Sequence, residues 1–265
     1  MRHEVNSSLE TEESFKIALG YDPSDEPTPL FEYSFHLAQL TAGEIVIVHA
    51  LEHVVSETVK EEEENLSHQL EKLLKTINLP EVPHKIEFLY GKDLENFVQF
   101  VEKEKINLFS FYYYKKLIGK TIAQEFLEQL ANCGLLVVKE KIPFREIKKV
   151  LVPIDFSESS SKQKDIVERI KNHAPYNIDF VFLHVLEEDN ETEREEVEML
   201  FKELFESYGE FKILVGEPEE EILKELEKET YNLVIVGRTG RGLNLVCGKV
   251  TKAVVEEAPC PVIVV

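Results

Sequence analysis

The stretch "EPEEEILKELEKETYNLVIVG" (residues 217–237) joins a predicted helix to a predicted strand. Pro218 and the glutamates after it are typical of a helix N-terminus, and Ile222, Leu223 and Leu226 would form its apolar face. The run "NLVIVG" that follows is continuously apolar, as in a strand that is buried on both faces of a sheet. The stretch therefore predicts a helix that packs against a parallel sheet.

The same alternation continues along the chain, where runs rich in Val, Ile, Leu and Phe are separated by amphipathic helical patterns. Five such strands and four helices alternate in each half of the sequence. We therefore expect an α/β fold of two tandem open parallel five-stranded sheets, Rossmann-like, with helices on both faces of each sheet. Sheets of this kind bind ligands beyond the carboxyl ends of their strands.

The sequence repeats itself, with four segments recurring in the same order. The two opening strands end at Asp22 and Asp155, and the second strands pair His49 with His184. The matched segments are 15–27 with 148–160, 44–52 with 179–187, 89–113 with 214–238, and 119–138 with 248–265. A duplicated domain follows, and we place the two copies at residues 15–140 and 147–265.

Composition limits the range of partners. The 265 residues include 51 acidic and 30 basic side chains, giving a formal net charge of −21. Such a surface repels phosphate backbones and anionic lipid, so we expect neither nucleic-acid nor membrane binding. No run approaches the about 20 apolar residues of a membrane span, and the sequence start lacks a signal-peptide core, so we expect a cytoplasmic protein.

The three cysteines, Cys133, Cys247 and Cys260, lack the spacing of a zinc site or a disulfide framework. We expect buried or idle thiols, and we expect no metal site.

Two features then coincide: "VPIDFSESS" at the start of the second half and "VGRTGRG…GK…APCPVIVV" at its end. Together they resemble the universal stress protein family, and the duplication resembles its tandem two-domain members. The resemblance extends from about residue 15 to the end of the chain. The first half is recognisable mainly through its alignment to the second.

This resemblance implies a site for an adenine nucleotide (ATP, ADP or AMP, with or without Mg²⁺) in the C-terminal domain. The implied nucleotide-binding residues form four groups: Pro153, Ile154 and Asp155 after the first strand; Val185 near the adenine; Gly237, Thr239, Gly240 and Arg241 in a first phosphate loop; and Gly248, Lys249, Val250 and Thr251 in a second. Glycines let backbone N–H groups approach a phosphate, and a helix start adds unpaired donors and partial positive charge.

The sequence departs from the family pattern in two ways. Seven residues separate Gly240 from Gly248, two fewer than in the family, and Lys249 stands where the family has Ser or Thr. Lys249 could pair with phosphate or be a solvated helix-start residue, and Thr251 could supply the missing hydroxyl. Asp155 also has a structural alternative, because an Asp after a strand caps the next turn. The glycines of the two loops have an alternative too: they could serve only the turn and the start of the helix, with no phosphate bound.

The first half has "FSFYYYKKLIG" (109–119) where the second has its glycine pair. Tyr112, Tyr113 and Tyr114 block close backbone approach, so we expect a degenerate phosphate loop without nucleotide, although Gly119, Lys120 and Thr121 keep the "GK" pattern. We interpret the tyrosines as packing or interface groups rather than as stackers for a base.

Each half ends in an apolar run, 134–138 and 260–265, that would lie at a sheet edge and is an aggregation hazard unless paired. In family members that dimerise the final strands meet across the interface, so the resemblance implies that the halves form this dimer within one chain, as an intramolecular pseudo-dimer. A further homodimer is compatible with the sequence.

Three functions remain open. The leading hypothesis is a nucleotide-responsive stress protein that acts as a sensor or regulator through a change of conformation or association. The alternative is a ligand-free scaffold that acts through protein contacts. The third is a slow ATP hydrolase, but we find no catalytic residues at convincing spacing, and we interpret His49 and His184 as structural imidazoles.

Overall fold

The computed structural model describes residues 14–51, 57–91, 94–114, 125–127, 130, 133–239 and 247–265. In the N-terminal half the elements are β1 (Lys16–Gly20), α1 (Thr28–Leu40), β2 (Glu44–Leu51), α2 (Glu57–Thr76), β3 (His84–Tyr90), α3 (Leu94–Glu104), β4 (Leu108–Tyr113) and β5 (Gly134–Lys139). In the C-terminal half they are β6 (Lys149–Pro153), α5 (Glu158–His173), β7 (Asp179–Leu186), α6 (Glu191–Leu204), β8 (Glu210–Val215), α7 (Pro218–Lys228), β9 (Leu233–Val236), α8 (Lys249–Glu257) and β10 (Val262–Val264).

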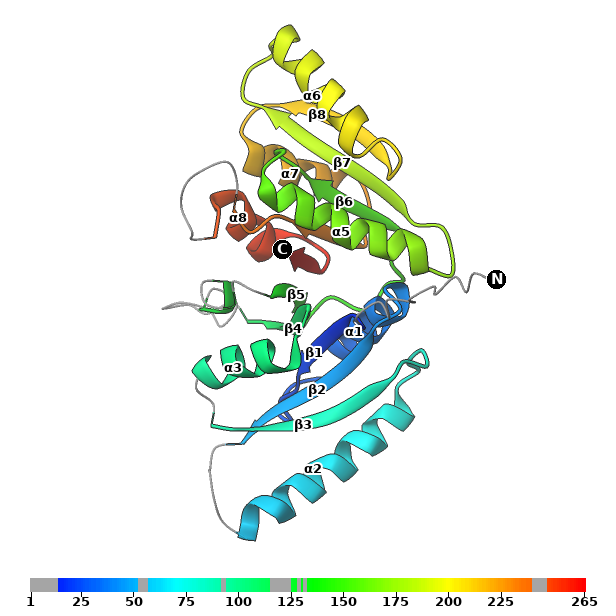
Figure 1. Ribbon diagram of the computed structural model, residues 1–265, viewed down its shortest axis with the longest axis vertical. Helices are drawn as coiled ribbons and strands as arrows, with labels where there is room; N and C mark the ends of the chain where they lie inside the picture. The colour runs from blue at the N-terminus through cyan, green and yellow to red at the C-terminus, as the bar shows by residue number, and fades with distance from the viewer. Residues whose placement is uncertain are drawn as a thin grey trace, which may run out of the picture.

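Within these described ranges the strands form one ten-stranded sheet in the order β3-β2-β1-β4-β5-β10-β9-β6-β7-β8. Every neighbouring pair is parallel except β5 and β10, which are antiparallel, with Leu136 opposite Ile263. The halves therefore stack along the long axis of the molecule and meet at β5 and β10 (Figure 1). The expected two sheets are instead one continuous sheet, because this pairing satisfies the backbone groups that two open edges would expose.

Helices cover both faces of the sheet and divide the core into two layers. One layer packs α1, α2, α5 and α6 against the sheet, and the other packs α3, α7 and α8. Both layers run across the two halves, since each contains residues of β5 and of β10. The helix predicted after residue 217 is confirmed: Ile222 and Leu226 of α7 are buried, with Leu223 partly buried beside them.

The duplication is visible in side-chain contacts at the amino ends of the strands. Asn107 Oδ1 accepts a hydrogen bond from the Lys16 N–H at 2.7 Å, and Asn232 Oδ1 accepts one from the Lys149 N–H at 3.1 Å. Each asparagine precedes the fourth strand of its half and fixes the start of the first strand. The repeat found in the sequence therefore extends to individual hydrogen bonds.

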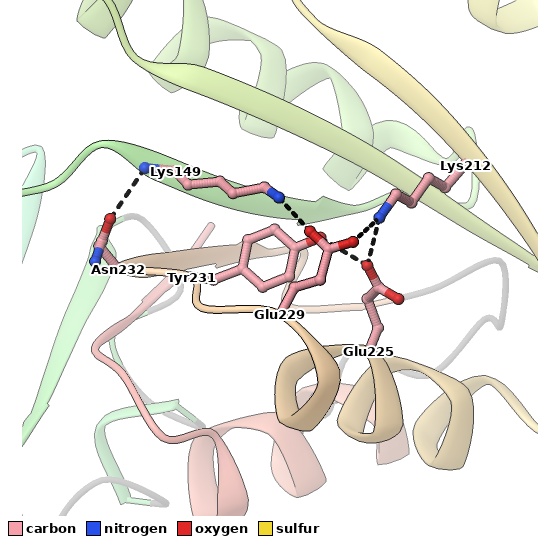
Figure 2. Close-up of polar contacts among 6 residues, drawn as sticks. All are labelled: Lys149, Lys212, Glu225, Glu229, Tyr231 and Asn232. Carbon is pink, nitrogen blue, oxygen red and sulfur yellow. Dashed lines mark hydrogen bonds and ion pairs between the residues drawn. The ribbon is translucent and has the colours of Figure 1, made fainter.

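A polar network surrounds the second of these contacts (Figure 2). Lys212 Nζ on β8 lies 2.8 Å from Glu225 Oε1 and 2.6 Å from Glu229 Oε1, and Lys149 pairs with Glu229 as well. Glu225 is buried and also accepts a hydrogen bond from the Tyr231 hydroxyl at 2.7 Å. The network links β6, β8 and α7 at the end of the sheet opposite to the predicted ligand site.

Contacts beyond the central strand pair also join the halves. Arg169 Nε on α5 donates to the carbonyl of Thr41 at 2.9 Å, and the Tyr176 hydroxyl lies 2.8 Å from His36 Nε2. Lys139 Nζ, at the end of β5, donates to the carbonyl of Ala258 at 2.5 Å, just beyond the C-terminus of α8. The halves thus share polar as well as apolar contacts.

Cys133, Cys247 and Cys260 are buried, as expected, and none of the three is in a disulfide. Burial raises the pKa of the Cys133 and Cys260 thiols to about 12. Within the part of the chain that the structure describes, no helix is long and apolar enough to cross a bilayer.

Candidate functional site

A cavity of about 210 Å³ lies at the carboxyl ends of β6, β7 and β9, beside the first turns of α7 and α8. Ten of the twelve residues implied by the resemblance line it: Pro153, Ile154, Asp155, Val185, Gly237, Thr239, Gly248, Lys249, Val250 and Thr251. The other two, Gly240 and Arg241, lie outside the described residues. Segments almost 100 residues apart in the sequence are thus brought around one space.

Gly237 is the first glycine of the predicted phosphate loop, and its small size has a packing reason. A Cβ added there would lie 2.6 Å from Ser159 Cβ on α5, closer than real carbon atoms approach. The end of β9 therefore passes α5 at a distance that only glycine allows. This glycine would be needed whether or not a phosphate binds.

Asp155 adopts the role of a turn cap while facing the cavity. Its Oδ1 accepts a hydrogen bond from the Ser157 N–H at 3.0 Å and from the Ser160 hydroxyl at 3.3 Å. The intervening Phe156 has φ +58°, a left-handed conformation uncommon for a bulky residue, which the cap holds in place. The structural alternative for Asp155 is therefore realised, and the cavity is lined by the same side chain.

The first turn of α8 begins at the cavity without a side-chain cap. Gly248 is its N-cap, and the Gly248 N–H donates to the carbonyl of Arg238 at 2.8 Å. The backbone donors of the next residues, Lys249 to Thr251, belong to the group that no helix can satisfy internally. These donors and the positive end of the helix dipole fit an anion.

Thr251 and Lys249 are both engaged within the protein. The Thr251 hydroxyl donates to the carbonyl of Gly237 at 2.6 Å, so its proton fixes the loop to the helix. Lys249 Nζ lies 2.7 Å from Glu219 Oε1 in the first turn of α7, and this pairing raises the pKa of Lys249. The lysine side chain is 80% exposed. It therefore lies at the rim of the cavity, where pairing is weak and exchangeable.

Gln163 was not predicted as a site residue, and the structure places it in the cavity wall. Its Nε2 donates to the carbonyls of Pro153 and Ile235, at 2.7 and 2.8 Å, and the residue is 1% exposed. The sequence signal that could have identified it is its spacing: Gln163 lies three positions before Ile166, on the buried face of α5. The other lining residues that were not predicted as site residues are apolar or part of β7: Leu183, His184, Pro218, Ile222 and Val236.

Arg238 lies inside the "GRTG" stretch but faces the other half of the molecule. Its guanidinium donates to the carbonyls of Leu127 and Cys133, each at 2.7 Å. Arg238 is buried, and burial lowers its pKa. The loop that begins at Gly237 is therefore attached directly to the N-terminal half.

The two strand-end histidines make the same contact. His49 Nδ1 lies 2.8 Å from the carbonyl of Tyr21, and His184 Nδ1 lies 2.8 Å from the carbonyl of Ile154. Each ring thus ties the second strand of its half to the residue that follows the first. These contacts support the structural interpretation of the two imidazoles. Gly119, Lys120 and Thr121 of the first half lie outside the described residues.

Across the described ranges, no group of three His, Cys, Asp or Glu side chains is arranged to hold a metal ion. The arrangement at the cavity offers backbone donors, one carboxylate and one lysine around an apolar interior. These groups suit a small ligand with an anionic group.

Comparisons with known proteins support this fold. The family model described as "Universal stress protein family" matches residues 146–265. A search of curated protein sequences gave no match. Among solved structures, a universal stress protein from Archaeoglobus fulgidus DSM 4304 matches with a TM-score of 0.67 at 18% identity, covering 94% of this chain and 95% of that one.

Two further structures match over the whole length. A putative universal stress protein from Pseudomonas aeruginosa UCBPP-PA14 has a TM-score of 0.69 at 14% identity, covering 96% of this chain and 93% of that one. A functionally unknown protein from Pseudomonas aeruginosa PAO1 has a TM-score of 0.68 at 13% identity, covering 96% and 92%. At these identities the similarity concerns the fold.

The fold is that of a mostly parallel α/β protein whose second half has a cavity of about 210 Å³ at the carboxyl ends of its strands. Residues 146–265 match the universal stress protein family model, and the whole chain shares its fold with solved universal stress proteins. The resemblance noted in the sequence is thereby confirmed, and the duplicated arrangement is consistent with it.

Proposed function

We propose that this chain is a tandem universal stress protein of the cytoplasm that binds an adenine nucleotide in its C-terminal half and acts as a sensor or regulator. The observation that carries the proposal is the gathering of ten implicated residues around one cavity at the carboxyl ends of β6, β7 and β9. Ligands of open α/β sheets bind at this end.

The donors at the cavity suit a phosphate group. The uncapped first turn of α8 supplies backbone N–H groups, and Lys249 at the rim supplies a positive charge. The apolar side chains of Val185, Ile222 and Val236 suit the base or sugar of a nucleoside. A bound ligand would supply the signal, and the chain's own residues would bind and orient it.

Two features favour a compact ligand over an extended triphosphate. The cavity of about 210 Å³ is below the about 300–1,000 Å³ of typical small-molecule sites. Glu219 also lies beside Lys249 and repels added negative charge. We therefore expect AMP or ADP to bind more tightly than ATP, with Mg²⁺ needed only where phosphate charge must be neutralised.

In this proposal residues 15–140 and 147–265 are the two domains of an intramolecular pseudo-dimer, and the N-terminal one lacks the nucleotide site. Arg238 joins the loop at Gly237 to the carbonyls of Leu127 and Cys133, which gives nucleotide binding a direct route to the other domain. A shift of that loop on binding would change the contact between the domains.

The test is mass analysis of nucleotide released from purified, denatured protein, followed by calorimetric titration of the full chain with AMP, ADP and ATP. Binding of at least one at micromolar concentrations supports the proposal. The absence of both retained nucleotide and binding heat at millimolar ligand would overturn it. That result would favour a ligand-free scaffold that acts through protein contacts, a function that the hydrogen bond from the Thr251 hydroxyl to the Gly237 carbonyl also favours. Release of inorganic phosphate over time would indicate a slow hydrolase instead.

Lys249→Met and Gly240→Val separate binding from folding. Lys249 is 80% exposed, so its replacement should weaken nucleotide binding and leave the melting temperature unchanged. Gly240→Val tests the predicted first phosphate loop. Unchanged affinity in both variants would show that the nucleotide binds elsewhere.

A further inference from the structure

The N-terminal half contains a cavity at the position that corresponds to the nucleotide site of the C-terminal half. It lies at the carboxyl ends of β1, β2 and β4, beside α3, and measures about 440 Å³. The equivalent cavity of the other half measures about 210 Å³. The volume in the N-terminal half falls within the about 300–1,000 Å³ of small-molecule sites. The half without the phosphate glycines thus has the larger cavity.

Aromatic side chains form much of the wall of this N-terminal cavity, among them Tyr21, Phe97, Phe111, Tyr112 and Tyr114. The residues that line the C-terminal cavity include no Phe, Tyr or Trp within the described ranges. Duplication has therefore produced two cavities of the same origin with different chemistry. Aromatic faces carry partial negative charge and attract cations.

Tyr112 is held in place from both sides. Its hydroxyl donates to the carbonyl of Glu26 at 2.6 Å and accepts from the N–H of Leu30 at 3.0 Å. The ring of Tyr114 lies 6.1 Å from the ring of Tyr112, with an angle of 58° between them. The two tyrosines thus form a fixed corner of the cavity, a use more specific than general packing.

Carboxylates complete the wall. Asp22, Asp25 and Glu125 line the cavity, and its described lining residues include no Lys or Arg. Burial raises the pKa of Asp25, with the neighbouring charges of Asp22 and Glu140 adding to the effect and a hydrogen bond from Tyr114 opposing it. Acidic groups that crowd together beside apolar walls are stabilised by a positive partner. The opposite holds for a phosphate, which these carboxylates would repel.

We propose that the N-terminal cavity binds a small organic cation, a quaternary ammonium or a protonated amine, between the carboxylates of Asp22 and Asp25 and the rings of Tyr112 and Tyr114. The aromatic walls take the apolar substituents of the cation, and the carboxylates balance its charge. The inference goes beyond the proposed nucleotide site and does not depend on it.

The test uses the full chain and a pair of probes with the same shape and different charge. Choline carries a quaternary ammonium, and 3,3-dimethylbutan-1-ol replaces its nitrogen by carbon. We expect calorimetry to show choline binding at least about tenfold more tightly than the neutral alcohol, since cation–π and carboxylate contacts act only on the charge. Equal affinities, or no choline binding at millimolar concentration, would overturn the proposal.

Competition separates this site from the nucleotide site. Choline and a saturating nucleotide, AMP or ATP, should bind the same chain simultaneously, because the two cavities lie in different halves; coupling through Arg238 would change the choline affinity without preventing simultaneous binding. Mutually exclusive binding of choline and nucleotide would show that the N-terminal cavity is an anion site and would overturn the proposal. Failure of nucleotide binding in the same experiment would leave the choline result intact.

Three variants assign the contacts. Asp25→Asn and Tyr114→Leu should each weaken choline binding at least about fivefold and leave the alcohol unaffected. Since Asp25 accepts a hydrogen bond from Tyr114, Glu125→Gln provides a third variant that spares this pair. Glu71→Gln, an exposed carboxylate on α2, is the matched control. The assignment would be contradicted if the control lost choline affinity, or if all three variants kept it.

Discussion

Arg238 donates a hydrogen bond to the carbonyl oxygen of Cys133, a residue 105 positions earlier in the chain, and thereby ties the loop after β9 to the N-terminal half. A second bond from the same guanidinium reaches the carbonyl of Leu127. Two buried backbone acceptors therefore depend on one side chain. The loop that contains the proposed phosphate site therefore also stabilises the junction between the halves.

Arg238→Met should lower the free energy of unfolding by about 3 kcal/mol, because both carbonyls lose a charged donor while they remain buried. Urea unfolding followed by circular dichroism measures the change. Arg194→Met, which removes a surface pair with Asp189, is the control and should cost less than about 1 kcal/mol. A loss of the same size in both variants would mean that the contact across the halves adds nothing.

Gly237→Ala should destabilise the protein by about 1–3 kcal/mol, since its Cβ would lie 2.6 Å from Ser159 Cβ. Ser159→Gly removes that obstacle, so the double variant should recover most of the loss relative to Ser159→Gly alone. A thermodynamic cycle of the four proteins measures the coupling. Additive effects would show that the close approach of residue 237 to α5 does not require a glycine there.

Glu219→Gln should raise nucleotide affinity about fivefold. The change removes a negative charge beside the proposed phosphate position and frees Lys249, which lies 2.7 Å from the carboxylate. Calorimetric titration with ADP measures the effect, and Glu203→Gln on α6 is the control for net charge alone. A decrease in affinity would instead identify Glu219 as a group that the ligand contacts.

Glu229→Gln should reduce the acid sensitivity of the fold. Hydrogen bonds from Lys149 and Lys212 lower the pKa of Glu229 from 4.5 to about 2 (Figure 2). In the unfolded chain the carboxyl takes up its proton near pH 4.5, whereas in the folded chain it stays ionised to about pH 2. Its contribution to stability is therefore present above pH 4.5 and is lost as the pH falls through this window.

Urea unfolding of the wild type and of Glu229→Gln at pH 6, 5, 4 and 3 measures this contribution. The difference in stability between the two proteins should be largest at pH 6 and should shrink at pH 3. Glu203→Gln, on the exposed surface, should parallel the wild type throughout. A constant difference across the series would exclude ionic pairing of Glu229 as its source.

Sequence patterns predicted the repeat and its consequences well. Strands buried on both faces are continuous apolar runs, and the equivalence of His49 and His184 follows from alignment of the halves, so their matching hydrogen bonds could be anticipated. The capping role of Asp155 was also open from the sequence, because it depends on residues two and five positions away. Contacts of this kind can be predicted because all the residues that make them are close together in the sequence.

Contacts between distant segments were not predictable in the same way. The acceptors of Arg238 are backbone carbonyls that any residue supplies, so no sequence pattern marks them. The Lys249–Glu219 pair joins two helix starts 30 residues apart, and its formation depends on how α7 and α8 pack. The joining of ten strands into one sheet likewise depends on the geometry of the β5 and β10 pair.

The β5 and β10 pair has an evolutionary consequence, because it joins two copies within one chain. A homodimer built on the same pair would have two identical sites, and any substitution in the gene would change both. In this chain a substitution affects one half alone, so each cavity can diverge while the shared sheet is kept. The apolar, glycine-framed cavity of one half and the aromatic, acidic cavity of the other are the two outcomes of that freedom.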